Sequence, residues 1–200
     1  MIVDKFIIVS TGWVAIATGI TGLLAFVFIV LFFSVGQPFG TINDVFIGLT
    51  AILSVVLVVM LFPWHLAQLP FFSSLGLSLA ILGAILVVIG SLLSILGITG
   101  YYLSGLYMAA GNALIGAWLL LLSYAALREN LIPQGLVIFG FISGFILLLG
   151  LAVFPALLKG TDTSEYVFTA FNAIWWTASL GYLVLFPLWS LLAGRSLLLK

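Results

Sequence analysis

The sequence predicts an all-α, polytopic membrane protein: a compact bundle of six transmembrane helices with both termini cytoplasmic. Only five basic and five acidic residues occur in the chain, 65% of its residues are hydrophobic, and the mean hydropathy is +1.46. The stretches from Lys5 to Asp44 and from His65 to Arg128 carry no charge between their ends. Because an apolar helix of about 20 residues crosses a bilayer, six spans fill most of a single domain, residues 1–200.

The first two spans are expected at residues 8–35 and 45–62. The first is longer than the hydrocarbon core requires, so it is expected to tilt or protrude. Residues 36–44 are rich in turn-forming side chains and are predicted to be a loop. The second span is predicted to end at Pro63, next to Trp64 and His65 at the membrane interface.

The third and fourth spans are expected at residues 75–98 and 104–127. Pro70 and two phenylalanines precede the third span and suit an interfacial turn. The break between the two spans is set at Thr99-Gly100-Tyr101-Tyr102. The fourth span is closed by Arg128, a cation that is favourable near a helix C-terminus.

The fifth and sixth spans are expected at residues 135–158 and 166–193. They are separated by the most polar loop of the chain, Lys159 to Glu165. Pro155 lies near the end of the fifth span. Pro187 is predicted to kink the last third of the sixth span, because proline removes one helical hydrogen bond.

Orientation in the cell membrane is predicted from the basic residues alone. With six spans, four of the five basic residues fall on one side, and only Lys159 falls on the other. Both termini are therefore expected in the cytoplasm. The four residues are Lys5, Arg128, Arg195 and Lys200.

Composition argues against several classes of function. The chain has no cysteine, which excludes thiol chemistry and disulfides, and it has one histidine. It has no basic patch, so nucleic acid is not an expected partner. No charged residue falls inside a predicted span, which argues against an enzyme and against a proton-coupled carrier. We expect no cofactor, with bound lipid as the exception.

Small residues form a regular stripe on the third span, where glycine recurs every seven residues. Such a stripe lets two membrane helices approach closely, so the third span is expected to be central to the bundle. Packing within the chain is the favoured interpretation, and self-association or ligand access is the alternative. The stripe is Gly76, Gly83, Gly90 and Gly97, with Gly105, Ala109, Ala113 and Ala117 as a partner stripe and Gly140 and Gly144 on the fifth span.

Polar residues recur at one depth of the predicted bundle. Asn112 and Asn172 lie in the outward halves of the fourth and sixth spans, and Trp176 shares a helical face with Asn172. Ser94 is expected at a similar depth. One hypothesis is a polar, ligand-binding cavity lined by these four residues. The alternative is interhelical hydrogen bonding, worth about 0.6–2 kcal/mol each.

His65 is the single side chain that could ligate a metal or pigment. Its place beside Trp64 favours contact with lipid headgroups. A role as axial ligand in a pigment- or haem-holding subunit of an electron-transfer or photosynthetic complex is the weaker alternative.

Two segments carry a resemblance to a known group of proteins. Gly111-Asn112-Ala113-Leu114-Ile115-Gly116-Ala117-Trp118 is followed by Arg128 and by Gln134-Gly135-Leu136-Val137-Ile138-Phe139-Gly140. The combination resembles uncharacterised six-span bacterial integral membrane proteins of about this length. The resemblance implies a compact helical bundle and supplies no functional residue.

Three functions are therefore in competition. The first is a non-catalytic membrane subunit or scaffold, an accessory component of a larger complex that contacts lipid and other membrane subunits or itself. The second is a binder or carrier of a neutral or lipophilic small molecule in the outward-half cavity. The third is the pigment- or haem-holding subunit.

Overall fold

The computed structural model describes residues 5–66, 70–129, 132–160, 162 and 169–199, without the side chains of residues 64–66, 70, 129 and 169–172. Within these ranges the secondary structure is helical, and six helices are long and apolar enough to span a membrane. The six-helix prediction is confirmed. The first four spans are α1 (Lys5–Val35), α2 (Phe39–Leu66), α3 (Pro70–Ile95) and α4 (Tyr101–Glu129).

The last two spans are each built from three pieces. The fifth comprises α5 (Gln134–Leu148), the 3₁₀ turn η1 (Leu149–Val153) and α6 (Phe154–Leu158). The sixth comprises α7 (Thr169–Leu180), the π-helical turn η3 (Gly181–Leu185) and α8 (Phe186–Leu198). Both interruptions lie just before a proline, Pro155 and Pro187, whose ring would clash with the carbonyl one turn earlier in a regular α-helix.

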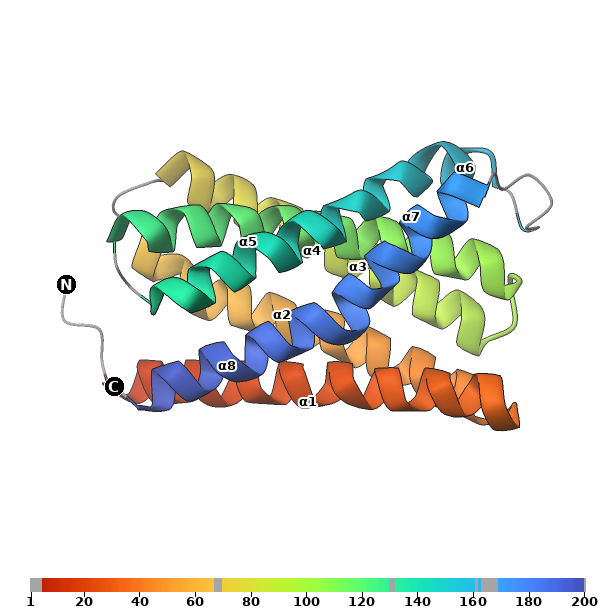
Figure 1. Cartoon of the computed structure of the whole chain (residues 1–200), viewed down its shortest axis with the longest axis horizontal. Coiled ribbons are helices and arrows are strands. Elements are labelled where there is room, and N and C mark those ends of the chain that lie inside the picture. The colour runs from red at the N-terminus through yellow and green to blue at the C-terminus, as the bar shows by residue number, and fades with distance from the viewer. Residues whose placement is uncertain (1–4, 67–69, 130–131, 161, 163–168, 200) are drawn as a thin grey trace.

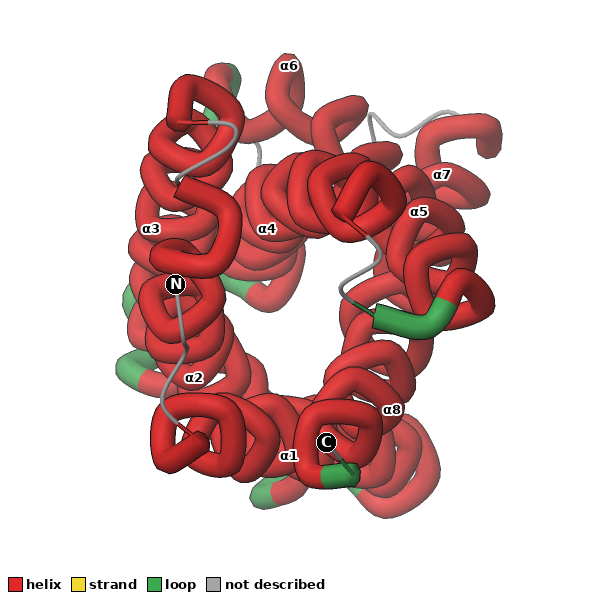
Figure 2. The backbone as a smooth tube through the Cα atoms, turned by 90° about the vertical axis from the view of Figure 1, so that its left-hand side faces the viewer, coloured by secondary structure: helices red, strands yellow, loops and turns green. Residues whose placement is uncertain are grey.

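The helices follow one another around a ring in chain order (Figure 2). Each of α1 to α4 packs against the next helix, α5 packs against α7 and α8, and α8 closes the ring against α1. Short connections enforce this up-and-down order. The two termini lie at one end, which we call the terminal end, and residues 36–38 and 96–100 lie at the opposite, distal end (Figure 1).

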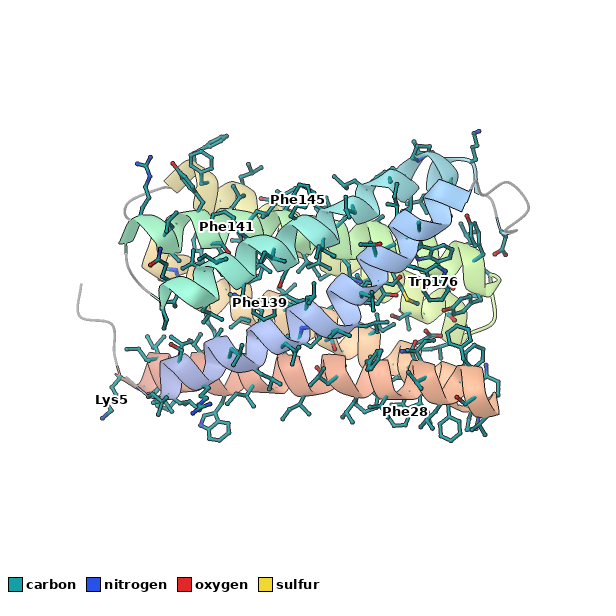
Figure 3. All side chains as sticks on the ribbon, in the orientation of Figure 1. Lys5, Phe28, Phe139, Phe141, Phe145 and Trp176 are labelled. Atoms are coloured by element: carbon teal, nitrogen blue, oxygen red, sulfur yellow. The ribbon has the colours of Figure 1, made fainter. Side chains whose placement is uncertain are left out.

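The outer surface of the ring is apolar, as lipid contact requires. Large hydrophobic side chains on every span are exposed, for example Phe26, Ile85, Ile142 and Phe145 (Phe145 is labelled in Figure 3). The chain is a multi-pass membrane protein by this criterion as well as by span length.

The predicted loop at residues 36–44 is mostly helix, and this is the main correction to the expected boundaries. Residues 36–38 alone reverse the chain, with Gly36 at φ 99°. The backbone N–H and the hydroxyl of Thr41 both donate to the Gln37 side-chain oxygen, at 3.4 and 3.3 Å. These bonds satisfy first-turn donors, so α2 begins at Phe39.

The third span is shorter than expected at its distal end, because α3 stops at Ile95. Gly97 has φ 63°, and the N–H of Ile98 donates to the carbonyl of Leu93 at 3.0 Å. This is the glycine-terminated helix end in which a left-handed residue satisfies the last carbonyls. Gly97 thus ends α3, and the structure places it outside the packing stripe.

The other stripe glycines of α3 contact α4. A methyl group added to Gly83 would lie 2.5 Å from the carbonyl oxygen of Gly111, and one added to Gly90 would lie 2.7 Å from that of Ser104. Gly76 faces Trp118. The expectation that α3 is central to the bundle is wrong, because 67% of the apolar stretch of α4 is buried against 33% of the corresponding stretch of α3.

The expected partner stripe on α4 faces other helices than α3. Gly150 of η1 lies against the carbonyl of Ala109, and Gly105 lies under the Trp175 ring. Gly144 of α5 meets the carbonyl of Gly116. The face of α4 that meets α3 instead carries Gly111 and larger residues. Residue spacing alone therefore assigned the contact with α3 to the wrong face of α4.

The sixth span changes neighbours along its length. In its α8 half it lies against α1, where methyl groups added to Gly194 and Gly19 would lie 2.6 Å from the carbonyls of Gly12 and Pro187. In its α7 half it packs against η1, α5 and α4. The span therefore runs diagonally from α1 at the terminal end to the fifth span at the distal end (Figure 1).

Candidate ligand cavity

A cavity of about 690 Å³ lies at the distal end of the bundle, where α7 has diverged from α1. Its volume falls in the range of about 300–1,000 Å³ that is usual for small-molecule sites. Residues of α1, α2, α4, α7 and η3 line it. We call it the distal cavity; its aromatic and acidic lining residues are Phe33, Tyr101, Tyr102, Trp175, Trp176, Tyr182, Asp44 and Asp162.

Asp44 is the central polar group of the distal cavity. It lies in the second turn of α2 and is only 5% exposed. The Ser94 hydroxyl donates to its Oδ2 at 2.5 Å. Within the described residues no basic side chain pairs with Asp44. Since a buried charge without a partner is costly, this carboxyl requires either a proton or a cation from outside the protein.

The position of Asp44 overturns one sequence inference. The carboxylate was expected in an external loop, and the spans were expected to hold no ionisable residue. Because α2 begins at Phe39, Asp44 lies inside the second span. With Asp44 inside a span, the predicted absence of charged residues from the spans no longer excludes a proton-coupled carrier.

Neighbouring residues of α2 fix its position against α1. Asn43, which is 2% exposed, donates from Nδ2 to the carbonyl of Ala25 at 2.7 Å. Two turns further along, the Thr50 hydroxyl lies 3.0 Å from that of Thr21. These contacts flank Asp44 and hold its helix in register.

Aromatic side chains form the wall of the distal cavity opposite α2. The rings of Tyr102 and Trp175 meet edge to face, with centroids 4.9 Å apart. Gly105 leaves the space beneath Trp175. The Tyr102 hydroxyl is buried and has no hydrogen-bond partner in the described part of the chain, so it is available to a bound molecule.

Asp162 lies at the rim of the distal cavity and stabilises the start of α4. Its carboxylate accepts hydrogen bonds from the backbone N–H groups of Gly100 and Leu103, at 2.7 and 3.0 Å. A carboxylate at the first N–H groups of a helix satisfies them and complements the helix dipole. Asp162 thereby ties the fifth-to-sixth connection to the start of α4.

The structure brings together two of the four residues predicted for a polar cavity. Trp176 lines the distal cavity, and Ser94 is bonded to Asp44. Asn112 lies away from the lining and donates to the carbonyl of Met108 in its own helix, at 2.9 Å. The side chains of Asn172 and His65 lie outside the described residues, so both predictions stay open.

Sequence reasoning missed Asp44, Tyr102, Trp175 and Tyr182. A signal for Asp44 was present, since it continues the three- and four-residue spacing of one buried face of α2. That face continues with Ile47, Ala51, Ser54 and Val58. The tyrosines and Trp175 had no such signal, because aromatic residues near span ends are ordinary interfacial residues.

No protein-family model, curated protein or solved structure matches this chain. The resemblance of residues 111–140 to six-span bacterial proteins therefore adds nothing to the functional argument. Among the described residues no group of three metal-ligating side chains forms a metal site.

Proposed function

We propose that this protein binds a small, lipophilic organic cation inside the membrane, in the distal cavity. One observation carries the proposal: Asp44 is buried among aromatic side chains and has no cationic partner among the described residues. A bound cation would supply the missing charge. The proposal changes the sequence-based hypothesis of a neutral or lipophilic ligand, because a neutral ligand would bind only beside a protonated Asp44, whereas a cation pairs with the carboxylate.

The composition of the walls supports a cation with apolar substituents, such as a quaternary ammonium ion. Carboxylates attract the charge, and the faces of tyrosine and tryptophan attract it as well, by about 0.5–2 kcal/mol each. Alkyl or aryl substituents would contact Ile47 and Met108. The free Tyr102 hydroxyl would serve a ligand oxygen or an ordered water molecule.

The proposal is tested with two probes of the same shape, benzyltrimethylammonium and its uncharged analogue neopentylbenzene. Purified protein in lipid nanodiscs is titrated with each by calorimetry. We expect the cation to bind more tightly, and Asp44→Asn to weaken it by about tenfold or more, since a charged contact contributes about 1.5–3 kcal/mol. Asn112→Leu, which removes a buried amide outside the lining, is the matched control and should leave the affinity unchanged. Equal binding of both probes to wild type and Asp44→Asn would refute the proposal.

For orientation, we propose that the termini are cytoplasmic and that the distal cavity lies in the outward half of the cell membrane. The basic residues support this assignment. Lys5, Arg128 and Arg195 belong to the terminal end, whereas Lys159 belongs to the distal end. Basic residues concentrate on the cytoplasmic side of membrane proteins.

A non-catalytic accessory subunit of a larger complex stays the competing proposal. It predicts that a partner subunit co-purifies from native membrane in mild detergent. It also predicts that neither benzyltrimethylammonium nor neopentylbenzene binds.

A further inference from the structure

We infer that the distal cavity opens sideways to the lipid between α1 and α7, and that its ligand is an amphiphile whose cationic head lies at Asp44. This inference rests on the proposed function and adds to it a ligand class and an entry route. The route is a gap bridged by one aromatic pair, Phe33 and Trp176, which we call the lateral gate.

The gap follows from the diagonal path of the sixth span. In α8 this span lies directly on α1, with Gly19 against Pro187 and Leu191. Beyond the π-helical turn η3, α7 packs against η1, α5 and α4, and among the described residues it makes no extended contact with α1. Two helices that touch in the terminal half therefore stand apart in the distal half.

The lateral gate spans this gap. The ring centroids of Phe33 and Trp176 are 6.3 Å apart, and the rings are tilted by 55°. Both side chains line the distal cavity, yet Phe33 is 60% exposed and Trp176 is 59% exposed. Each ring thus borders the cavity and also has a large exposed surface (Trp176 is labelled in Figure 3). In a membrane protein that surface faces lipid, and an aromatic pair near the span ends lies close to the headgroups.

The polarity of the distal cavity matches a lipid-like molecule lying in the adjacent leaflet. Asp44, Tyr101 and Asp162 surround its distal part. Its floor is an apolar cluster of Ile29, Ile47, Met108 and Leu183, which belong to one packed core. On α1 and α2, Ile29 and Ile47 lie about one turn further into the membrane than Phe33 and Asp44.

A single-chain amphiphile would match both the polar distal part and the apolar floor of the cavity. Its ammonium head would pair with Asp44, its first methylene groups would cover the apolar floor, and the rest of its chain would pass between Phe33 and Trp176 into the bilayer. Entry from the leaflet keeps the chain out of water throughout, which removes the cost of exposing apolar area during binding.

The class of ligand is tested with alkyltrimethylammonium ions in nanodiscs. Binding of the butyl and dodecyl members is measured by equilibrium dialysis against the free aqueous concentration, with the amount taken up by protein-free nanodiscs subtracted as background. We expect the dodecyl ion to bind at least about tenfold more tightly on this aqueous scale, since the methylenes that leave water for the apolar floor and the bilayer add to affinity. Equal affinities of the two ions on the aqueous scale would refute the amphiphile.

The route is tested by closing the lateral gate. The chain has no cysteine, so Phe33→Cys/Trp176→Cys can be linked by a short bis-methanethiosulfonate reagent without background. The matched control is Phe28→Cys/Phe46→Cys, a ring pair at 5.3 Å that joins α1 to α2 away from the cavity lining. Association of radiolabelled dodecyltrimethylammonium is followed by rapid filtration.

We expect the link at the gate to slow association by about tenfold or more, a reducing agent to restore it, and the control link to have no effect. Unchanged association in the linked gate variant would refute lateral entry. Asp44→Asn, measured in parallel, distinguishes failure of the proposed function from failure of the entry route. If Asp44→Asn binds the cation as tightly as wild type does, the proposed function fails. If Asp44→Asn loses binding but the linked gate variant still takes up the ligand at the normal rate, only the lateral route is overturned.

Discussion

At the scale of single residues, Asp44 is the feature that distinguishes this molecule from a simple apolar bundle. Among the described residues its carboxyl accepts a hydrogen bond from the Ser94 hydroxyl, and the surrounding lining offers aromatic faces in place of a cation. Groups that are poorly satisfied in the unliganded protein are characteristic of functional sites, where stability is given up for binding.

Asp44→Asn should therefore stabilise the unliganded protein while it weakens cation binding. The amide is neutral, so the cost of burying an unpaired carboxylate disappears, by about 1–3 kcal/mol. Thermal unfolding in detergent without ligand is expected to shift upward. A downward shift would mean that Asp44 is a structural hydrogen-bond acceptor for Ser94 and would count against a binding role.

Binding of benzyltrimethylammonium should weaken as the pH is lowered, because protons and the cation compete for the same carboxylate. Below the titration midpoint the affinity should fall about tenfold per pH unit. The other ionisable lining groups are Asp162 and the phenols of Tyr101, Tyr102 and Tyr182, and phenols stay protonated throughout the acid range. The residual binding to Asp44→Asn should be independent of pH, and the same slope in that variant would assign the effect to Asp162.

Sequence reasoning identified site residues only where helical spacing or an isolated polar side chain marked them. Ser94 and Trp176 were found in this way, whereas Asp44 was missed because one misplaced helix start moved it out of the membrane. Asn112 was assigned to the cavity on its depth and on the cost of exposing an amide to lipid. The side chain is buried, but neither criterion says which neighbours it meets, and it donates to a carbonyl of its own helix.

At the scale of the helices, close backbone contact between α3 and α4 is the main packing device. It depends on paired glycines, and Gly83 faces the carbonyl of Gly111 directly. The spacing of the α3 glycines predicted that α3 packs through its glycine stripe. The spacing could not reveal which face of α4 contacts this stripe, because α4 carries small residues on several faces and packs them against three neighbours.

Gly83→Ala should destabilise the protein, and Gly135→Ala should not. A methyl group at position 83 would lie 2.5 Å from a backbone oxygen, so the helices must separate, at a cost of about 1–3 kcal/mol. At Gly135 nothing lies within 4 Å of the added methyl group, and alanine favours the helix by up to about 1 kcal/mol. Thermal unfolding of the two variants should shift in opposite directions, and equal shifts would mean that this contact does not hold α3 and α4 together.

At the scale of the whole molecule, the number and order of spans follow from bilayer thickness and short connections. Both can be read from sequence, and they account for most of the ring. The divergence of α7 from α1 cannot be read in this way. It results from the close fit of α8 on α1, the packing of α7 on η1 and the π-helical turn between them, none of which leaves a periodic signal.

Orientation is accessible to a labelling experiment because the chain has no cysteine. Gln37 and Gln134 are exposed at the distal and terminal ends, respectively. In intact cells Gln37→Cys should react with a membrane-impermeant maleimide, and Gln134→Cys should react only after lysis. The reverse pattern would place the distal cavity on the cytoplasmic side.

The π-helical turn Gly181–Leu185 also determines how the side chains of α7 are rotated about the helix axis relative to those of α8. A π turn holds one residue more than an α turn, and each residue advances an α-helix by about 100°. Removing one residue there would restore a continuous helix and rotate every side chain of α7 by that angle, while α8 stayed seated on α1. Trp176 would then turn away from Phe33, so this single additional residue sets which face of α7 looks into the protein.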